Sequence, residues 1–99
     1  MVEFKVQREK NDEGGRYFVT LPGHQEAAEL TWLDIGPSLI AANHTFVPET
    51  MRGQGVAEAM VHQLVSDAHN ESIRILPLCT YVQAQFARHP EWEDVRKDL

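Results

Sequence analysis

The segment Arg52–Ala57, with the sequence RGQGVA, contains residue types that can bind an anion through the backbone. Gly53 and Gly55 have no side chains, so an anion can approach the main chain closely there. A helix beginning at Val56 would present N–H groups that have no partner inside the helix, at the positive end of its dipole. Together with the Arg52 cation, these features predict a phosphate site. A turn that merely leads into a helix would contain the same glycines.

Two familiar phosphate-binding patterns do not fit this segment. The glycines are not followed by the Lys-Ser or Lys-Thr pair of a Walker loop, and the third glycine of a dinucleotide fingerprint is absent. The loop alone therefore identifies no ligand.

Cys79 is the second candidate for chemistry and the only cysteine of the chain. It follows the strand-ending Pro77 and precedes a predicted helix, and a helix N-terminus favours the thiolate. A thiolate there could accept an acyl group and pass it on. The same side chain could instead give a proton to a leaving thiolate, or could line a cavity as a small hydrophobic group.

His44 is the nearest candidate for a general base, because it lies on the strand that leads to the loop. A histidine that is hydrogen-bonded for structural reasons is the alternative. Glu49 is a second candidate base, although capping or solvating the loop fits its position better. The other histidines have no metal-ligand spacing with cysteine or acidic residues, so no zinc site is expected; they are His24, His62, His69 and His89.

The hydrophobic pattern predicts strands first and helices later. Val2, Phe4 and Val6 alternate with polar residues and predict a strand that forms a hairpin with Arg16–Leu21 across the turn Asn11–Gly15. The further predicted elements are strands over 26–33, 39–47 and 73–76, a main helix from Val56 to about Asn70, a shorter helix over 83–88 and a last helical turn within 91–98. The strand over 26–33 is predicted to place Ala28, Leu30 and Trp32 on one face. The apolar side of the main helix is predicted to comprise Ala57, Met60, Val61, Leu64, Val65 and Ala68. This order predicts an α+β domain with a mainly antiparallel sheet of about five to six strands.

Size and composition restrict the class of protein. The 99 residues suffice for one domain, residues 1–99, and the net charge of −6 argues against binding to nucleic acid or anionic membranes. No apolar run approaches the roughly 20 residues that span a bilayer, and the N-terminus lacks the apolar core of a signal peptide. With a single cysteine, the chain is expected to be cytoplasmic.

The loop resembles a motif of the GNAT (GCN5-related N-acetyltransferase) superfamily. Arg52, Gly55 and Ala57 match its pattern [RQ]-x-x-G-x-[GA]. The segments HTFVP before the loop, LPLCTYV after it and HPEW near the end are similar to a smaller branch, the single-domain YjdJ-type acetyltransferases. The similarity runs from about Glu26 to Asp98.

The resemblance implies a role for each matched segment. The backbone of the strand end would pair with the pantetheine arm of acetyl-coenzyme A, through Thr45, Phe46 and Val47. The loop would hold the pyrophosphate through main-chain N–H groups, namely those of Arg52, Gly53, Gln54, Gly55, Val56 and Ala57. Cys79 would lie where two strands separate and the thioester arrives.

The resemblance implies an acetyl-coenzyme A-dependent N-acetyltransferase acting on an unidentified primary amine, including amines of peptides or proteins. The acetyl group would move by direct attack or through Cys79. A non-catalytic coenzyme A or acyl-coenzyme A binding module and a small interaction domain are the alternatives. Typical members have two helices that wall the acceptor pocket, whereas Asn11–Gly15 leaves space only for a turn. The acceptor site is therefore expected to be open.

Overall fold

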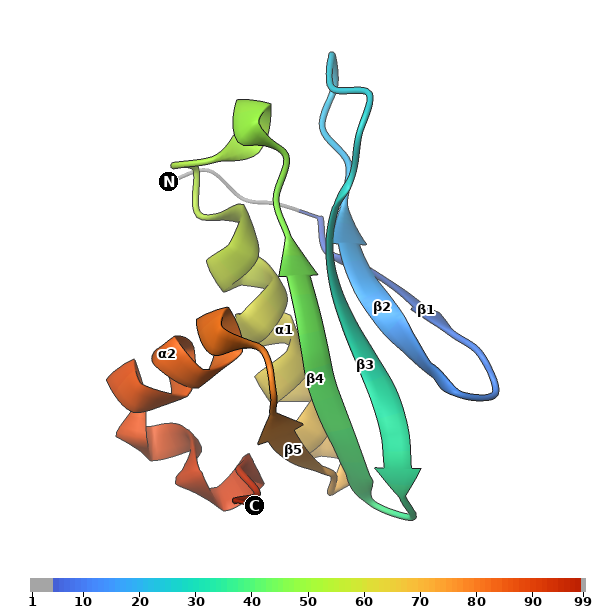
Figure 1. Ribbon diagram of the computed structural model, residues 1–99, viewed down its shortest axis with the longest axis vertical. Coiled ribbons are helices and arrows are strands. Elements are labelled where there is room, and N and C mark those ends of the chain that lie inside the picture. Colours follow the sequence, from blue (N-terminus) through green and yellow to red (C-terminus); the bar gives the residue numbers. More distant parts are fainter. Residues whose placement is uncertain (1–4, 99) are drawn as a thin grey trace.

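The computed structural model describes residues 5–98 and contains five strands, two α-helices and two short 3₁₀ helices (Figure 1). The strands are β1 (Gln7–Lys10), β2 (Gly14–Val19), β3 (Ala28–Gly36), β4 (Leu39–Phe46) and β5 (Arg74–Pro77). The helices are η1 (Glu49–Met51), α1 (Val56–Glu71), α2 (Thr80–Arg88) and η2 (Pro90–Val95).

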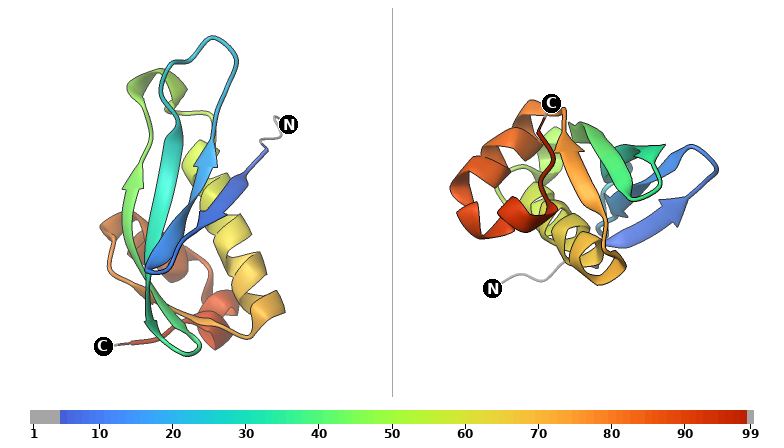
Figure 2. Two further views of the ribbon diagram at one scale, coloured as in Figure 1. Left: turned by 90° about the vertical axis from the view of Figure 1, so that its right-hand side faces the viewer. Right: turned by 90° about the horizontal axis from the view of Figure 1, so that it is seen from below.

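The strands form one sheet in the order β1-β2-β3-β4-β5. The first three pairs are antiparallel, and only β4 and β5 run parallel, because α1 connects them as a crossover. The helices lie on one side of this sheet, as Figures 1 and 2 show. The expected α+β fold, with a mainly antiparallel sheet and a main helix after the fourth strand, is confirmed.

The core lies between the sheet and α1. Ala28, Leu30 and Trp32 point from β3 towards the helices and are buried, which confirms the predicted face of that strand. The buried side of α1 comprises Val56, Met60, Val61, Leu64, Val65 and Ala68. The sequence pattern had placed Ala57 on this side in place of Val56; Ala57 is only half-buried, because it borders the pocket described below.

Several predicted boundaries were wrong, among them the end of β3, which lies at Gly36 and not at residue 33. The first strand begins at Gln7, and the part of its predicted range over residues 2–4 lies outside the described residues. The side-chain oxygen of Asn11 accepts the N–H groups of Glu13 and Gly14, which fixes the hairpin turn and pairs Gln7–Lys10 with β2. The second helix begins at Thr80, directly after Cys79, three residues earlier than predicted.

A β-bulge at Asn43 reverses the alternation of β4. Ala42 is paired with Trp32 and His44 with Thr31, so Asn43 is the extra residue. Thr45 is consequently paired with Leu30 and faces the helices, whereas His44 faces the opposite side of the sheet. The Thr31 hydroxyl donates to Oδ1 of Asn43 at 2.7 Å, which holds the bulged side chain on that opposite side.

β4 and β5 separate just beyond Ala42. The carbonyl oxygen of Ala42 accepts both the N–H of Leu78 (2.9 Å) and the N–H of Cys79 (3.0 Å). The ladder between the two strands ends at Ala42 and Pro77, while β4 continues to Phe46. The edge of β4 that follows therefore faces the start of α2 instead of a strand.

Replacement of Tyr17 by phenylalanine is expected to lower the free energy of unfolding by about 1 to 2 kcal/mol. The buried hydroxyl of Tyr17, on β2, donates to Oδ2 of Asp67 on α1 at 2.7 Å, and burial raises the pKa of this phenol so that it stays a donor. The variant leaves Asp67 with Gln63 as its hydrogen-bond donor and with the more distant charge of Arg8. Urea unfolding measures the difference, and an unchanged midpoint would contradict it.

Candidate functional site

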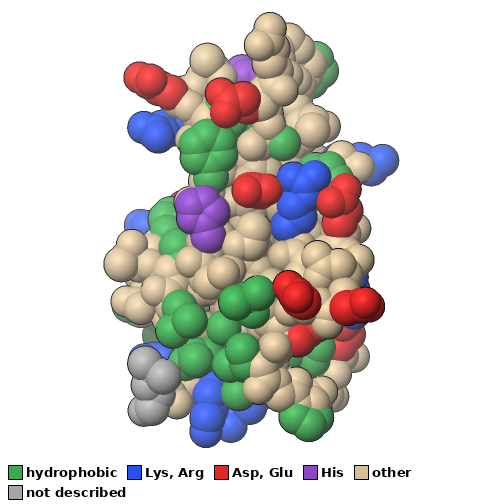
Figure 3. Space-filling view, turned by 45° about the vertical axis from the view of Figure 1, so that its right-hand side comes forward, with side chains coloured by type: hydrophobic (Ala, Val, Ile, Leu, Met, Phe, Trp, Pro, Cys, Tyr) green, Lys and Arg blue, Asp and Glu red, His purple; other side chains and the backbone are tan. Residues whose placement is uncertain are grey.

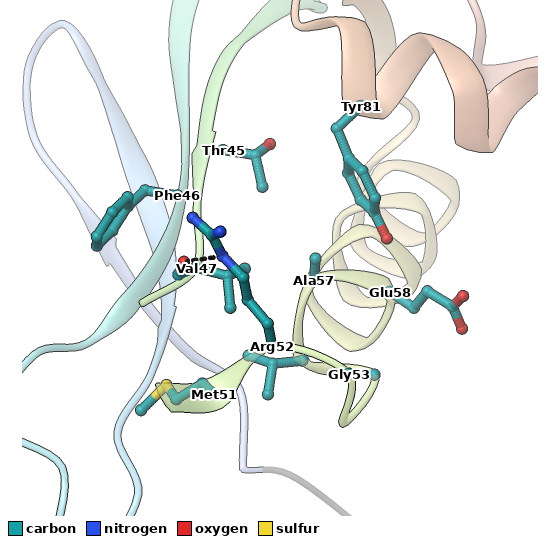
Figure 4. A pocket seen from close by; sticks show the side chains of 11 residues that line it. Thr45, Phe46, Val47, Met51, Arg52, Gly53, Ala57, Glu58 and Tyr81 are labelled. Atoms are coloured by element: carbon teal, nitrogen blue, oxygen red, sulfur yellow. Dashed lines mark hydrogen bonds between the residues drawn. The ribbon is translucent and has the colours of Figure 1, made fainter. Parts of the chain in front are cut away.

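A pocket of about 490 Å³ lies between the end of β4 and the start of α1 (Figure 4). Its lining comes from three parts of the chain: Thr45, Phe46, Val47, Met51, Arg52, Gly53, Gly55, Val56, Ala57, Glu58 and Tyr81. The structure thus brings together the strand end 45–47 and the loop 52–57, for which the family resemblance implied the same ligand. Gln54 is the one residue of these two segments outside the lining, and its side-chain amide donates to the carbonyl oxygen of Thr50 (3.4 Å).

The loop takes its shape from two glycines in the left-handed region. Gly53 has φ of 82° and Gly55 has φ of 84°, a conformation that other residues adopt at a cost. Gly55 is the N-cap residue of α1, and its carbonyl oxygen accepts the N–H of Ala59. A Cβ at either glycine would meet nothing within 4 Å, so the space before the helix is open to a ligand. The first N–H groups of α1 are directed at that space.

Arg52 and Glu58 place opposite charges on the pocket wall. Nε of Arg52 donates to the carbonyl oxygen of Val47 at 3.3 Å, and Figure 4 shows the side chain reaching back from the loop towards the end of β4. Glu58 lies in the first turn of α1. The arrangement offers a cation and a helix N-terminus to an anion, with a carboxylate at one border.

Cys79 lies at the end of the pocket where β4 and β5 separate. It is the N-cap residue of α2, half-buried, and its thiol donates to Oγ1 of Thr45 at 3.4 Å. Burial raises the pKa of this thiol, but the Thr45 hydroxyl and the N–H groups at the start of α2, those of Val82 and Tyr81, outweigh it and lower the pKa below its usual value. Cys79 itself is not part of the pocket lining, but it is hydrogen-bonded to Thr45, which is.

His44 is not brought to the pocket. The bulge turns its side chain to the exposed face of the sheet, away from Thr45 and Cys79. Glu49 is exposed in η1. No histidine among residues 5–98 lines this pocket, and in the same range no three histidine, cysteine or acidic side chains are grouped as metal ligands would be. The roles predicted for His44 and Glu49 stay predictions.

Tyr81 is a pocket residue that reasoning from the sequence missed. It lies in the first turn of α2, and Figure 4 shows its ring facing Thr45 and Ala57 across the pocket. Burial, and secondly the charge of Glu58, raise the pKa of this phenol, so it keeps its proton at neutral pH. The side-chain amide of Gln85 donates to its oxygen at 3.2 Å. This helix was predicted to begin at residue 83. A helix predicted from Thr80 would have placed Tyr81 in its first turn, close to Cys79.

Within residues 5–98, none of the helices has the length and the apolar composition that crossing a membrane would need.

Comparison with known proteins yields a family match over most of the chain. A family model described as GCN5-related N-acetyl-transferase matches residues 16–95. This range includes the pocket, Cys79, the strands β3, β4 and β5 and most of β2.

Curated relatives are similar at lower identity. Protein NATD1 of Gallus gallus is 25% identical over 85 residues, which cover 86% of this chain and 77% of that protein. Protein NATD1 of Bos taurus is 29% identical over 84 residues, covering 84% and 74%, and that of Homo sapiens is 27% identical with the same coverage. A GCN5-like protein from Staphylococcus aureus, solved by NMR, superposes with a TM-score of 0.71 over 94% of this chain and 89% of that chain. Its sequence identity is 19%, so it supports the fold alone.

Proposed function

Because the chain belongs to the GCN5-related N-acetyltransferase family, we propose that it transfers an acetyl group from acetyl-coenzyme A to a primary amine. Family membership makes the chain an acyltransferase. Members of this family generally take acetyl-coenzyme A as co-substrate. The co-substrate, the route of the acetyl group, the YjdJ-type subtype and a cytoplasmic location are parts of the proposal for this chain.

The observation that carries the proposal is the open loop at the N-terminus of α1. Gly53 and Gly55 leave room for phosphate oxygens next to the backbone, and the unpaired N–H groups of the first turn can donate to them. Arg52 adds a cation at the pocket wall. The unpaired edge of β4 leads from this loop towards Cys79, which suits the extended pantetheine arm. The donor set therefore fits coenzyme A.

Acetyl-coenzyme A, when bound, supplies an activated acyl group. The Cys79 thiolate can attack its carbonyl carbon: the bond from Cys79 Sγ to that carbon forms, and the bond from the carbon to the coenzyme A sulfur breaks. Tyr81, protonated at neutral pH, can give its proton to the departing sulfur. A neutral amine nitrogen then forms the amide bond, the bond from the acetyl carbon to Cys79 Sγ breaks, and Cys79 leaves as a thiolate. The proton that the nitrogen loses returns to the Tyr81 oxygen and restores the phenol. Direct attack of the amine on the thioester is the alternative route.

The acceptor side is open, which favours an amine on a peptide or protein. β1 and β2 are joined by a tight turn at Asn11–Glu13, so no helix from this connection walls the sheet. The face opposite α1 exposes Leu33 and Ile35 to solvent, at 43% and 46%, and Figure 3 shows hydrophobic side chains gathered on its lower part. A small free amine would find few enclosing groups there, whereas a macromolecular acceptor can use a broad surface.

The test is release of free thiol from acetyl-coenzyme A in the presence of amines, polyamines and lysine peptides. Thiol release that depends on one of these acceptors is expected. Isothermal titration separates the rival functions. Binding of coenzyme A without acceptor-dependent release in any arm would leave the non-catalytic binding module, and absence of heat with both forms of the cofactor would leave a small interaction domain.

Replacement of Arg52 by glutamine is expected to weaken coenzyme A binding about tenfold, because one charge-assisted hydrogen bond to phosphate is lost. The variant should also reduce the salt dependence of the affinity. Titration at two salt concentrations measures both effects. Arg74, an exposed arginine of β5 outside the pocket lining, provides the matched control as Arg74→Gln. Equal losses in the two variants would contradict a specific role of Arg52.

A further inference from the structure

The Thr45 side chain is placed to act on Cys79, a role separate from the backbone contacts expected of the strand end. Thr45 is the residue of β4 that both lines the pocket and touches the thiol, with its hydroxyl oxygen 3.4 Å from Cys79 Sγ. Its hydroxyl can accept a hydrogen bond and can also donate one. A valine there would have nearly the same shape but could do neither.

This contact depends on the bulge at Asn43. In a regular strand, every second residue after the inward-facing Ala42 would face the helices, so His44 would lie on that side. The bulge shifts this alternation by one residue, and Thr45 faces the helices instead. The Ala42 carbonyl oxygen in turn anchors the N–H of Cys79 at 3.0 Å. β4 therefore supplies the Thr45 hydroxyl and also anchors the backbone of Cys79. Main-chain hydrogen bonds thus fix the positions of both residues.

We propose that Thr45 is a positioning residue for Cys79: its hydroxyl accepts the hydrogen bond of the thiol and reverses to donate to the sulfur once the proton has left. Cys79 itself is the N-cap residue of α2, and the N–H groups of the first turn of that helix also favour the thiolate. The sulfur is thus held between a strand and a helix, at the end of the pocket. This inference rests on the proposed function, in which Cys79 reacts as a thiolate.

The groups around the sulfur belong to β4 and α2. Thr45 shares a side-chain hydrogen bond with it, while the N–H groups of Tyr81 and Val82 help to lower its pKa without forming a capping hydrogen bond. None of these three residues carries a charge at neutral pH. The hydroxyl at position 45 is therefore the one side-chain group within residues 5–98 whose removal directly takes a hydrogen bond from the sulfur. This makes the effect of a single substitution interpretable.

The test measures the pH dependence of Cys79 alkylation by iodoacetamide, without cofactor. Since the chain has one cysteine, every alkylation event reports Cys79. Thr45→Val, which keeps the shape and removes the hydroxyl, should shift the profile to higher pH and slow the reaction at neutral pH about five- to tenfold. Thr45→Ser, which keeps the hydroxyl, should stay close to wild type. Thr20→Val is the matched control, because it removes an exposed hydroxyl just after β2, outside the pocket lining and away from the bulge.

A profile of Thr45→Val that coincides with wild type would overturn the proposal, and so would an equal shift in Thr20→Val. Ultraviolet absorbance of the thiolate gives the same titration if burial slows the reagent. Thermal unfolding followed by circular dichroism identifies a variant that fails to fold. If Thr45→Val does not fold, the serine variant decides: a profile of folded Thr45→Ser that is shifted to higher pH, with a reaction at neutral pH about five- to tenfold slower, overturns the proposal. Alkylation needs no acetyl transfer, so failure of the proposed acetyltransferase activity would leave this test intact and is seen separately in the thiol-release assay.

Discussion

Replacement of Gly55 by glutamate should reduce the affinity for coenzyme A by a factor on the order of 100 or more, while the protein stays folded. The Cβ of the new residue would meet nothing within 4 Å, so no clash disturbs the loop. The backbone cost of a side chain at φ 84° is about 1 to 2 kcal/mol.

The large effect on binding follows from the position of Gly55 at the N-cap of α1. A carboxylate at this position can accept hydrogen bonds from the same first-turn N–H groups that the pyrophosphate would use, and it is stabilised by the same end of the helix dipole. The variant thus fills the anion site with its own side chain. Any pyrophosphate that still entered would meet a negative charge, and Glu58 already contributes another nearby.

Two variants separate this effect from strain and from net charge. Gly55→Ala has the same backbone cost without a carboxylate, and should lose only a few-fold in affinity. Gly23→Glu adds the same charge at φ 82°, also with nothing within 4 Å, but in the turn between β2 and β3 and outside the pocket lining. Isothermal titration with coenzyme A compares the three. Unchanged affinity in Gly55→Glu would contradict the assignment of the loop.

Local signals predicted the fold and the position of the glycine loop before α1, because these features depend on short-range physics. Alternation identified the buried face of β3, and the change of period at Val56 identified α1. The glycines that were expected to bring an anion close to the backbone do have left-handed φ values and open space. These features are encoded by neighbouring residues, so a pattern in the sequence suffices.

The arrangement around Cys79 depends on register, which the sequence does not display. A one-residue bulge decides whether His44 or Thr45 faces the helices. The sequence around these two residues contains no signal that distinguishes a bulged strand from a regular one. The start of α2 is a similar case. Cys79 caps this helix without a side-chain hydrogen bond, so the usual N-cap signal was missing, and Tyr81 was overlooked.

Cys79→Ala is expected to lower the rate of acetyl transfer on the order of 100-fold or more, whether the thiolate attacks the thioester or the thiol donates a proton. Mass spectrometry after incubation with acetyl-coenzyme A distinguishes these roles. Wild type should gain the mass of one acetyl group, and the alanine variant should gain none. A rate that falls without an acetyl adduct in wild type would assign Cys79 to proton donation and the transfer to direct attack by the amine.

Cys79→Ser makes the argument sharper, because a serine hydroxyl preserves the small polar side chain and can bond to Thr45. It does not ionise near neutral pH, so the variant removes the nucleophile while keeping the local hydrogen bond. We therefore expect the serine variant to be as slow as the alanine variant and to bind coenzyme A like wild type, since Cys79 lies outside the pocket lining. If both variants transfer acetyl groups at the wild-type rate, the side chain only fills space between β4 and α2. An acetyl adduct that persists in Cys79→Ala would place the modification on another residue and contradict the covalent route.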